Sequence, residues 1–181
     1  MKLPRLLAAA AALAVLVPTV AQAALPQPTS RLIVANTSLA GVVLNSSYAK
    51  AHKAWGTGGV CSPTTGCVYS KDAAVATNGS ASFTIAQVTT TAKPKVVQIS
   101  LRAGTTASGT YVFDQALTRY TTSKGIGLGS TTAQLKHAYA HIHSEAGGFG
   151  YYLKGTGARQ TTFNVNKGRV VGIFMNSVHL G

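Results

Sequence analysis

The stretch Gly125–Ala140 reads GIGLGSTTAQLKHAYA, and a related stretch occurs 84 positions earlier. That earlier stretch, Gly41–Gly56, reads GVVLNSSYAKAHKAWG. Aligned without gaps, the two share five identical residues and three close matches in sixteen positions, with Trp55 opposite Tyr139. Because one pattern occurs twice at a fixed offset, we expect the chain to be a tandem pair of one small unit.

Each of the two stretches has the apolar spacing of a short amphipathic helix. The apolar residues recur at i, i+7, i+10 and i+11, which places them on one helix face: Leu44, Ala51, Ala54 and Trp55, and Leu128, Leu135, Ala138 and Tyr139. Ser46 and Ser130 stand where an N-cap is expected. A helix of about ten residues is marginal by itself in water, so we expect each to pack on the strands that follow it.

Three predicted strands follow each predicted helix. They show the apolar alternation of a half-buried sheet, and they are Cys67–Lys71, Ala81–Val88 and Lys95–Arg102 in the first unit, and Phe149–Lys154, Gln160–Val165 and Arg169–Met175 in the second. The segment Asn166–Gly168 is typical of a compact hairpin turn with Gly168 at positive φ. The predicted class is therefore α+β, a tandem repeat of a helix followed by a three-stranded antiparallel meander, with the helices packed on one sheet face. Whether the two sheets join is left open.

The chain divides into four predicted segments. These are a signal peptide (1–23), a first unit (24–103) with the lead strand Arg31–Ala35, a linker (104–110) that contains the flexible stretch Gly104–Gly109, and a second unit (111–181) that opens with the strand-like Tyr111–Tyr120. The signal peptide is indicated by Lys2 and Arg5, the apolar run Leu6–Val17 and the small-residue cleavage site Ala21–Ala23. The apolar run is too short for a membrane span. We therefore expect a secreted or periplasmic protein with no transmembrane segment after cleavage.

Two cysteines, Cys61 and Cys67, flank a Pro-Thr-Thr-Gly turn. In an exported protein this arrangement favours a disulfide that closes a hairpin. The closed loop is short, so the chain-entropy model gives about 2 kcal/mol of stabilisation. A metal site would need further soft ligands close by in the sequence, and none is found there.

The formal net charge is +13, of which Lys2 and Arg5 contribute two, leaving +11 after cleavage. The imbalance arises because Asp72, Asp114 and Glu145 are the only acids in the sequence. Such a surface favours polyanions or an acidic protein, although a basic exported protein without a polyanionic partner has the same composition. A glycosidase needs two poised carboxylates and a serine hydrolase of the common type has a G-x-S-x-G motif, which this sequence lacks. We expect a protein without enzymatic activity and without a cofactor.

Two residue groups are candidate sites. His137, His141 and His143 have a spacing that can chelate Zn²⁺ or Cu²⁺, but the helix is expected to end near Ala140, where protonated histidines also complement the helix dipole. The aromatic group, Tyr151, Tyr152 and Phe163, forms a possible binding face, and at strand spacing it equally suits a core. Nucleic acid is not an expected partner for an exported protein.

Three segments carry a resemblance to known families. Gly129–Leu135, Tyr151–Tyr152 and Gly168–Val171 resemble the repeat of the SmpA/OmlA (BamE-like) group and of exported β-lactamase-inhibitory-protein-like modules. In those families the motif is typically Gly-Met-Thr-x-x-Gln-Val before a helix, an aromatic strand and a closing Gly-x-Val strand. Here Asn45 replaces the motif glycine of the first unit and Pro94 interrupts its closing turn. The residue directly after the cleavage site is not a cysteine, which argues against a lipoprotein.

The resemblance implies the fold, export and the binding of another protein or an envelope component, and it brings no catalytic residues. The leading hypothesis is a non-enzymatic exported protein that binds an extracellular or envelope protein, or an anionic envelope polymer, through a sheet face or a groove between the units. One alternative is a metal-binding protein or metalloenzyme using His137, His141 and His143. Another, implied by the resemblance alone, is an inhibitor of an extracellular enzyme.

Overall fold

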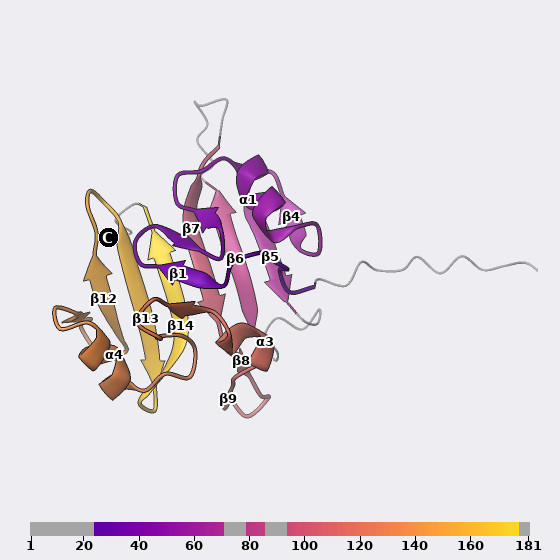
Figure 1. Cartoon of the computed structure of the whole chain (residues 1–181). Helices are drawn as coiled ribbons and strands as arrows, with labels where there is room; N and C mark the ends of the chain where they lie inside the picture. The colour runs from indigo at the N-terminus through magenta and orange to yellow at the C-terminus, as the bar shows by residue number, and fades with distance from the viewer. Residues whose placement is uncertain (1–23, 71–78, 86–93, 178–181) are drawn as a thin grey trace, which may run out of the picture.

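The computed structural model describes residues 24–70, 79–85 and 94–177, and the predicted signal peptide lies outside these residues. The protein belongs to the α+β class, as predicted, and is rich in strands (Figure 1). One large antiparallel sheet dominates it. Its eight strands are β4 (Val60–Ser62), β5 (Gly66–Ser70), β6 (Ser80–Ile85), β7 (Val96–Arg102), β11 (His143–Ser144), β12 (Gly150–Lys154), β13 (Gln160–Asn166) and β14 (Arg169–Asn176).

The two predicted sheets join into one. The strand order is β11-β12-β13-β14-β7-β6-β5-β4, so the last strand of the first half pairs with the last strand of the second half. The pairing of β7 with β14 is antiparallel and runs from Gly172 opposite Arg102 to Asn176 opposite Gln98. The order of the strands in the second half is therefore the mirror of the order in the first half. Each half contributes four strands where three were predicted, because the short edge strands β4 and β11 were not anticipated as strands.

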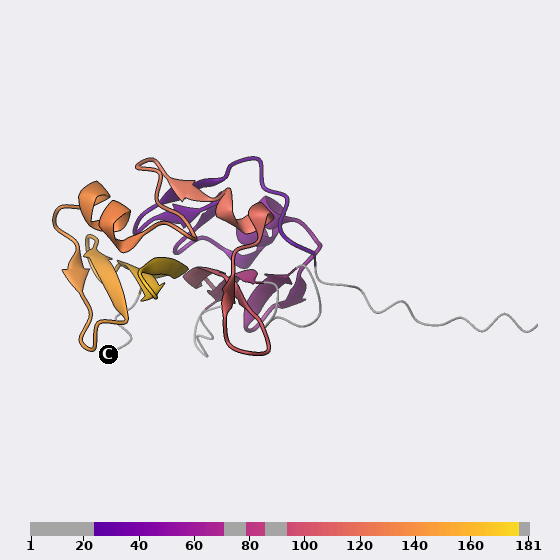
Figure 2. The same ribbon diagram turned by 90° about the horizontal axis from the view of Figure 1, so that it is seen from below.

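A second sheet of four short strands lies on one face of the large sheet, together with the helices (Figure 2). Its order is β10-β1-β2-β3, with the bounds β10 (Thr121–Thr122), β1 (Leu32–Val34), β2 (Ser38–Leu39) and β3 (Val42–Val43). The predicted lead strand Arg31–Ala35 is thus confirmed, but it pairs with β10 of the second half and not with the large sheet.

The region between the halves differs from prediction. The predicted linker Gly104–Gly109 is not a free link, since β8 (Gly104–Thr105) pairs with β9 (Tyr111–Val112) in a hairpin. The predicted strand-like segment Tyr111–Tyr120 contains only β9 and then the short helix α3 (Gln115–Thr118). Asp114 begins α3 because its carboxylate accepts a hydrogen bond from the backbone N–H of Ala116 at 2.7 Å. The apolar pattern of this segment indicated a strand and not a helix that begins at Asp114.

The two predicted helices are α1 (Tyr48–Trp55) and α4 (Thr132–Ala138). Their N-caps are Ser47 and Thr131, one residue after the predicted Ser46 and Ser130. Thr131 forms a capping box with Gln134, in which each side chain bonds the other residue's backbone N–H, at 3.1 and 2.8 Å. Each half has two adjacent hydroxyl residues at this point of the chain, and the sequence does not indicate which of the two is the N-cap.

The main core lies between the large sheet and the layer of helices and short strands. Trp55 is 1% exposed, packs edge-on against Tyr69 of β5 at 5.3 Å, and donates its Nε1–H to the Ala40 carbonyl at 3.1 Å. In the second half, Tyr139 packs against Phe163 of β13 at 5.9 Å. The predicted apolar positions Ala51, Trp55 and Leu135 form the buried side of the two helices. Leu44 and Leu128 are also in the core, but they lie before the helices begin.

Two local predictions are confirmed. Cys61 and Cys67 lie opposite each other on β4 and β5 and form a disulfide. The β13–β14 turn has Lys167 at φ 45° and Gly168 at φ 73°, the left-handed geometry expected of a tight hairpin. No helix in the described part of the chain is long and apolar enough to cross a membrane.

Candidate interaction face of the large sheet

The two faces of the large sheet have different surroundings. Tyr69, Thr161 and Phe163 point toward the helical layer, where they contact Trp55, Asn36 and Tyr139 respectively. Neighbouring residues along a strand point to opposite faces, so the alternate positions point away from that layer. Figure 2 shows the helices on one side of this sheet, and no helix among the described residues covers the other side. We call the side that faces away from the helices the open face.

Strand register gives a continuous row of side chains across the open face. In order from β11 to β4 the row is His143, Tyr152, Thr162, Phe174, Ser100, Ser82, Val68 and Val60. Aromatic residues thus lie in the second half and at the centre, hydroxyl residues lie between, and exposed valines end the row in the first half. The row extends over both halves because β7 and β14 pair.

Phe174 is the aromatic residue nearest the centre of the open face. It is half-buried, and a Cβ atom on the neighbouring Gly172 would lie 2.7 Å from its Cε2 atom. Glycine at this position therefore leaves room for the ring of Phe174 to lie along the strand. The Cζ atom of Arg102 lies 6.0 Å from the ring centroid, within reach of a cation–π interaction.

Tyr152 is the second aromatic residue of the open face. Its ring stacks on His143 of the adjacent strand, with centroids 5.1 Å apart and planes 23° from parallel. Lys154, two residues along the same strand, places its Nζ atom 5.9 Å from the same ring. Arg102, His143 and Lys154 are all exposed, so both aromatic rings of the open face have a basic side chain at the surface beside them.

Amide and hydroxyl groups between the rings are held in place by one another. Gln98 donates from Nε2 to Asn176 Oδ1 at 2.9 Å across the β7–β14 seam, and Gln160 donates from Nε2 to Thr162 Oγ1 at 3.1 Å. The hydroxyls of Ser82 and Ser100 also bond each other. These pairs fix the orientation of the polar side chains between the rings, of which Ser100 and Thr162 are buried.

Acidic groups are sparse at the open face. A Cβ atom at Gly150 would lie 2.6 Å from Glu145 Oε2, which places this carboxylate over β12 near the β11 edge of the sheet. Asp114 is engaged as the cap of α3, and Asp72 lies outside the described residues. Among the described residues the electrostatic character of the face is therefore basic, with one carboxylate at its margin.

The predicted aromatic binding group does not share one face. Tyr152 lies on the open face, whereas Tyr151 and Phe163 pair with each other on the face toward the helices. Phe163 is 0% exposed and packs against Tyr139, so it is a core residue in this structure. Tyr151 is half-buried with Lys136 of α4 5.1 Å from its ring. The period of two that governs strands separates the adjacent tyrosines.

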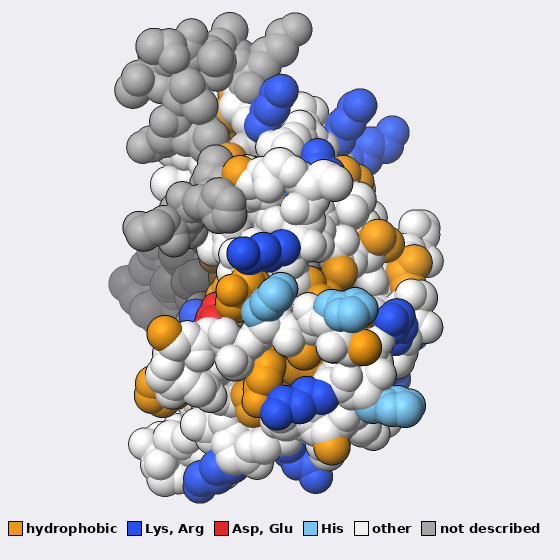
Figure 3. Space-filling model, turned by 90° about the vertical axis from the view of Figure 1, so that its left-hand side faces the viewer, with side chains coloured by type: hydrophobic (Ala, Val, Ile, Leu, Met, Phe, Trp, Pro, Cys, Tyr) orange, Lys and Arg blue, Asp and Glu red, His pale blue; other side chains and the backbone are white. Residues whose placement is uncertain are grey.

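The predicted histidine cluster does not assemble. His137 lies in the last turn of α4, His141 lies in the following turn, and His143 lies on β11. The three are not among the groups of described residues whose ligand atoms come close enough to hold a metal ion together. Figure 3 shows the side of the molecule that carries α4 and β12, where histidine side chains lie separately among Lys and Arg. The helix ends before His141, which removes the i, i+4 pairing.

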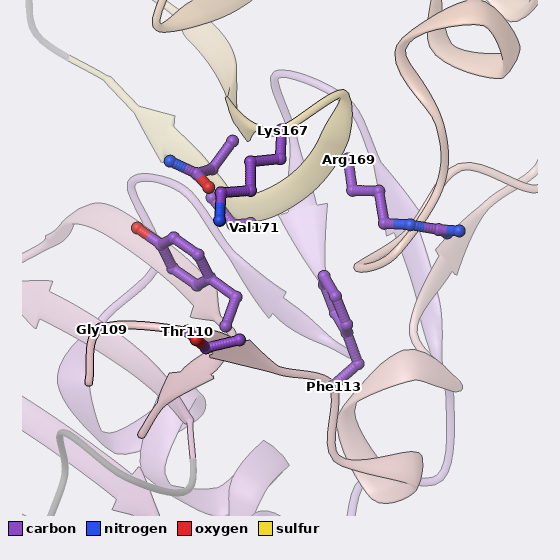
Figure 4. Close-up of a pocket in the computed structure, with 8 residues that line it drawn as sticks. Gly109, Thr110, Phe113, Lys167, Arg169 and Val171 are labelled. Carbon is purple, nitrogen blue, oxygen red and sulfur yellow. The ribbon is translucent and has the colours of Figure 1, made fainter. Parts of the chain in front are cut away.

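A hollow of about 240 Å³ lies between the β8–β9 hairpin and the β13–β14 turn. Its lining includes Tyr111, Phe113, Lys167 and Arg169 (Figure 4). Lys167 and Arg169 extend in opposite directions from the turn, and Arg169 donates to the Gly129 carbonyl at 2.8 Å. The two cations therefore do not converge on one point, as recognition of a small anion would require.

Two tyrosines have raised pKa values, and both lie in buried positions. Burial, with a smaller contribution from Tyr48, raises the pKa of Tyr69 to about 12. Burial also raises the pKa of Tyr120, partly opposed by Arg31. Tyr69 donates its hydroxyl to the Gly56 carbonyl at 2.8 Å. Burial is the main cause of both shifts.

Sequence reasoning missed Phe174 and Arg102 as surface candidates. Both lie in strands that were predicted correctly, and counting alternate positions from Ile99 and Ile173 would have placed them on the opposite face from the core. What the sequence could not indicate was that β7 and β14 are neighbours, which brings these two side chains together.

Comparison of the chain with protein-family models, curated proteins and solved structures finds no match.

Proposed function

We propose that this chain is an exported, non-enzymatic binding protein that holds an acidic protein partner on the open face. The observation that carries the proposal is the combination of Phe174 and Tyr152 with adjacent exposed basic side chains on a helix-free sheet surface. Aromatic and arginine side chains are the residues most often responsible for protein–protein affinity. The hydroxyl and amide groups around them supply a polar surround.

The dimensions of the open face suit a macromolecular partner. Eight strands at a spacing of about 4.8 Å span about 34 Å, comparable to the width of a standard protein–protein interface. The net charge of +11 after signal cleavage and the shortage of carboxylates favour a partner with an acidic surface. An anionic envelope polymer shares that charge, but it would use the charges alone and not the aromatic rings.

We also propose that the two halves are copies of one unit, as in the families named above. The offset of 84 residues that relates the two helices also relates Trp55 to Tyr139 and Gly66 to Gly150. The mirrored strand order of the large sheet is what a pseudo-twofold pairing of two such units would give. In this proposal the open face is a composite surface that neither unit forms alone.

The test is affinity capture with the mature, oxidised protein as bait, from culture supernatant and envelope extract, at low and high salt. A protein partner that binds the open face is retained by the wild type at high salt and lost when Tyr152 and Phe174 are both changed to Ala. The matched control is Tyr151→Ala, which alters the adjacent tyrosine on the covered face. It should retain the partner, once circular dichroism has shown that it is folded.

Two outcomes would contradict the proposal. Retention of the same partner by the Tyr152→Ala/Phe174→Ala variant would exclude the open face as the site. Capture of anionic polymer alone, lost equally from every variant as salt rises, would mean that the net charge is responsible and that no protein partner is selected.

A further inference from the structure

One group of metal-ligating side chains comes together in the described residues, although the sequence analysis argued against a metal site at its two cysteines. The ligand atoms of His52, Cys61 and Cys67 all lie within 4.8 Å of one another. His52 comes from α1, and the two cysteines come from β4 and β5 directly beneath that helix. The sulfur atoms are joined as a disulfide, so in this state they offer no thiolate to a cation.

Backbone pairing holds the two cysteines opposite each other independently of the bond between their sulfurs. Backbone pairing of Val60 with Val68 and of Ser62 with Gly66 brackets the Cys61–Cys67 pair on both sides. β5 is paired in turn with β6 over five residue pairs. Opening the disulfide therefore leaves both thiols on the same hairpin, facing the same helix.

The imidazole of His52 is also held in place. Its ring stacks on Tyr48, one turn earlier on α1, with centroids 5.6 Å apart and planes 18° from parallel. The Tyr48 hydroxyl lies 3.8 Å from Cys67 Sγ, so the tyrosine contacts both ends of the group. His52 and Cys61 are half-exposed and Cys67 is buried, which gives a cation or a small reductant access from one side.

We propose that two-electron reduction of the Cys61–Cys67 disulfide opens a Cys₂His site for one Zn²⁺ ion. An external dithiol donates two electrons and two protons, the S–S bond breaks into two thiols, and the dithiol becomes its own disulfide. Zn²⁺ then displaces the two thiol protons and takes both thiolates and the imidazole nitrogen of His52. Three protein ligands with a fourth position left open to water are an ordinary zinc donor set.

The consequence is a switch in which oxidation and metal binding exclude each other. In the reverse direction an external disulfide accepts two electrons from the two thiolates and becomes a dithiol, the Cys61–Cys67 bond forms again and the ion is released. A bound ion, conversely, keeps the thiolates from oxidising. This inference concerns the face toward the helices and does not depend on what binds the open face.

The experiment compares zinc binding by the full mature chain in its oxidised form and after reduction with a phosphine under anaerobic conditions. Competition with a chromophoric chelator measures the stoichiometry and Kd for Zn²⁺. We expect one tightly bound ion per reduced chain, and at least a hundredfold weaker binding by the oxidised chain. His52→Ala should weaken binding at least tenfold. His137→Ala, which removes a histidine from the last turn of the other helix, should leave it unchanged.

A second measurement reports the ligands directly. Zinc should protect both cysteines of the reduced wild type from alkylation, and Co²⁺ in place of Zn²⁺ should give a thiolate charge-transfer band. Equal binding by oxidised and reduced protein, or identical binding by His52→Ala and wild type, would overturn the proposal. Loss of the native circular dichroism spectrum on reduction would also overturn it, because the site requires the hairpin to persist.

Discussion

The two halves of the molecule use the same place in the chain, the end of the helix, in different ways. In the first half, Trp55 is buried to 1% exposure and its indole N–H bonds the Ala40 carbonyl. In the second half the aligned residue, Tyr139, is half-buried and packs against Phe163. Lys124 lies 4.8 Å from the Tyr139 ring and donates to the Ala138 carbonyl at 2.6 Å. One helix is held by core burial and the other partly by surface contacts.

The difference extends to the starts of the helices. Thr131 and Gln134 form a complete capping box on α4, whereas the cap of α1 is a single bond from Lys50 N to Ser47 Oγ at 3.5 Å. The half with the weaker aromatic anchor thus has the stronger cap. A short helix on a sheet can therefore be stabilised by its N-cap or by an aromatic residue at its C-terminal end, and one helix need not have both in strong form.

The largest expected effect comes from removing the two aromatic anchors. Trp55→Ala should lower the free energy of unfolding by about 3–5 kcal/mol, because it leaves a cavity against Tyr69 and removes the donor to Ala40. Tyr139→Ala should lower it by about 1–2 kcal/mol, because the side chain is half-exposed and water fills its place.

Urea unfolding followed by circular dichroism measures both variants, since Trp55 is the only tryptophan and its loss removes the fluorescence probe. Leu135→Ala serves as a control for the second half, because Leu135 is 0% exposed on the helix α4 itself. It should cost about 2–4 kcal/mol. Equal losses for Trp55→Ala and Tyr139→Ala would refute the proposed difference between the anchors.

Removing the N-caps should have the opposite ranking: the loss of stability should be larger in the second half than in the first. Thr131→Ala should destabilise the protein by about 1–2 kcal/mol, because it removes the side-chain acceptor for the Gln134 backbone N–H, while the bond from the Thr131 backbone N–H to the Gln134 side chain remains. Ser47→Ala should cost about 0.5 kcal/mol, because the bond it removes is long. Thermal unfolding of both variants tests this, with Ser46→Ala, beside the α1 cap, as the control because its hydroxyl makes no hydrogen bond.

Much of the fold was readable from the sequence because the signals are local. Strand alternation located β5, β6, β7, β12, β13 and β14 to within a few residues, and apolar spacing located the buried side of both helices. The disulfide followed from two cysteines around a turn. The errors have physical causes too: β4 and β11 are too short to show alternation, and α3 depends on the single cap Asp114.

The candidate surface was less predictable because it depends on pairing between distant strands. Tyr152 was singled out by its residue type, but its neighbour His143 and its place in one row with Phe174 follow only from register across four strands. The group of His52, Cys61 and Cys67 likewise requires that α1 lie over the β4–β5 hairpin. Local patterns carry no information on either arrangement.

The two halves should also differ in how their stability depends on pH. The position aligned with Tyr69 is Leu153, so at this place the first half has an ionisable group and the second has none. Burial raises the pKa of Tyr69 to about 12 in the folded protein, whereas the unfolded chain releases the proton near pH 10. Its contribution to stability is thus fully present below pH 10 and is lost as the pH rises from 10 to 12.

Tyr69→Phe should be less stable than wild type at neutral pH by about 1 kcal/mol, because the Gly56 carbonyl loses its donor, yet it should lose less stability between pH 10 and 12. Urea unfolding at successive pH values measures both slopes. Tyr120, whose pKa is also raised, keeps part of the alkaline loss in the variant, so the slope should decrease without vanishing. Parallel slopes for the two proteins would show that Tyr69 does not hold its proton more tightly in the folded state.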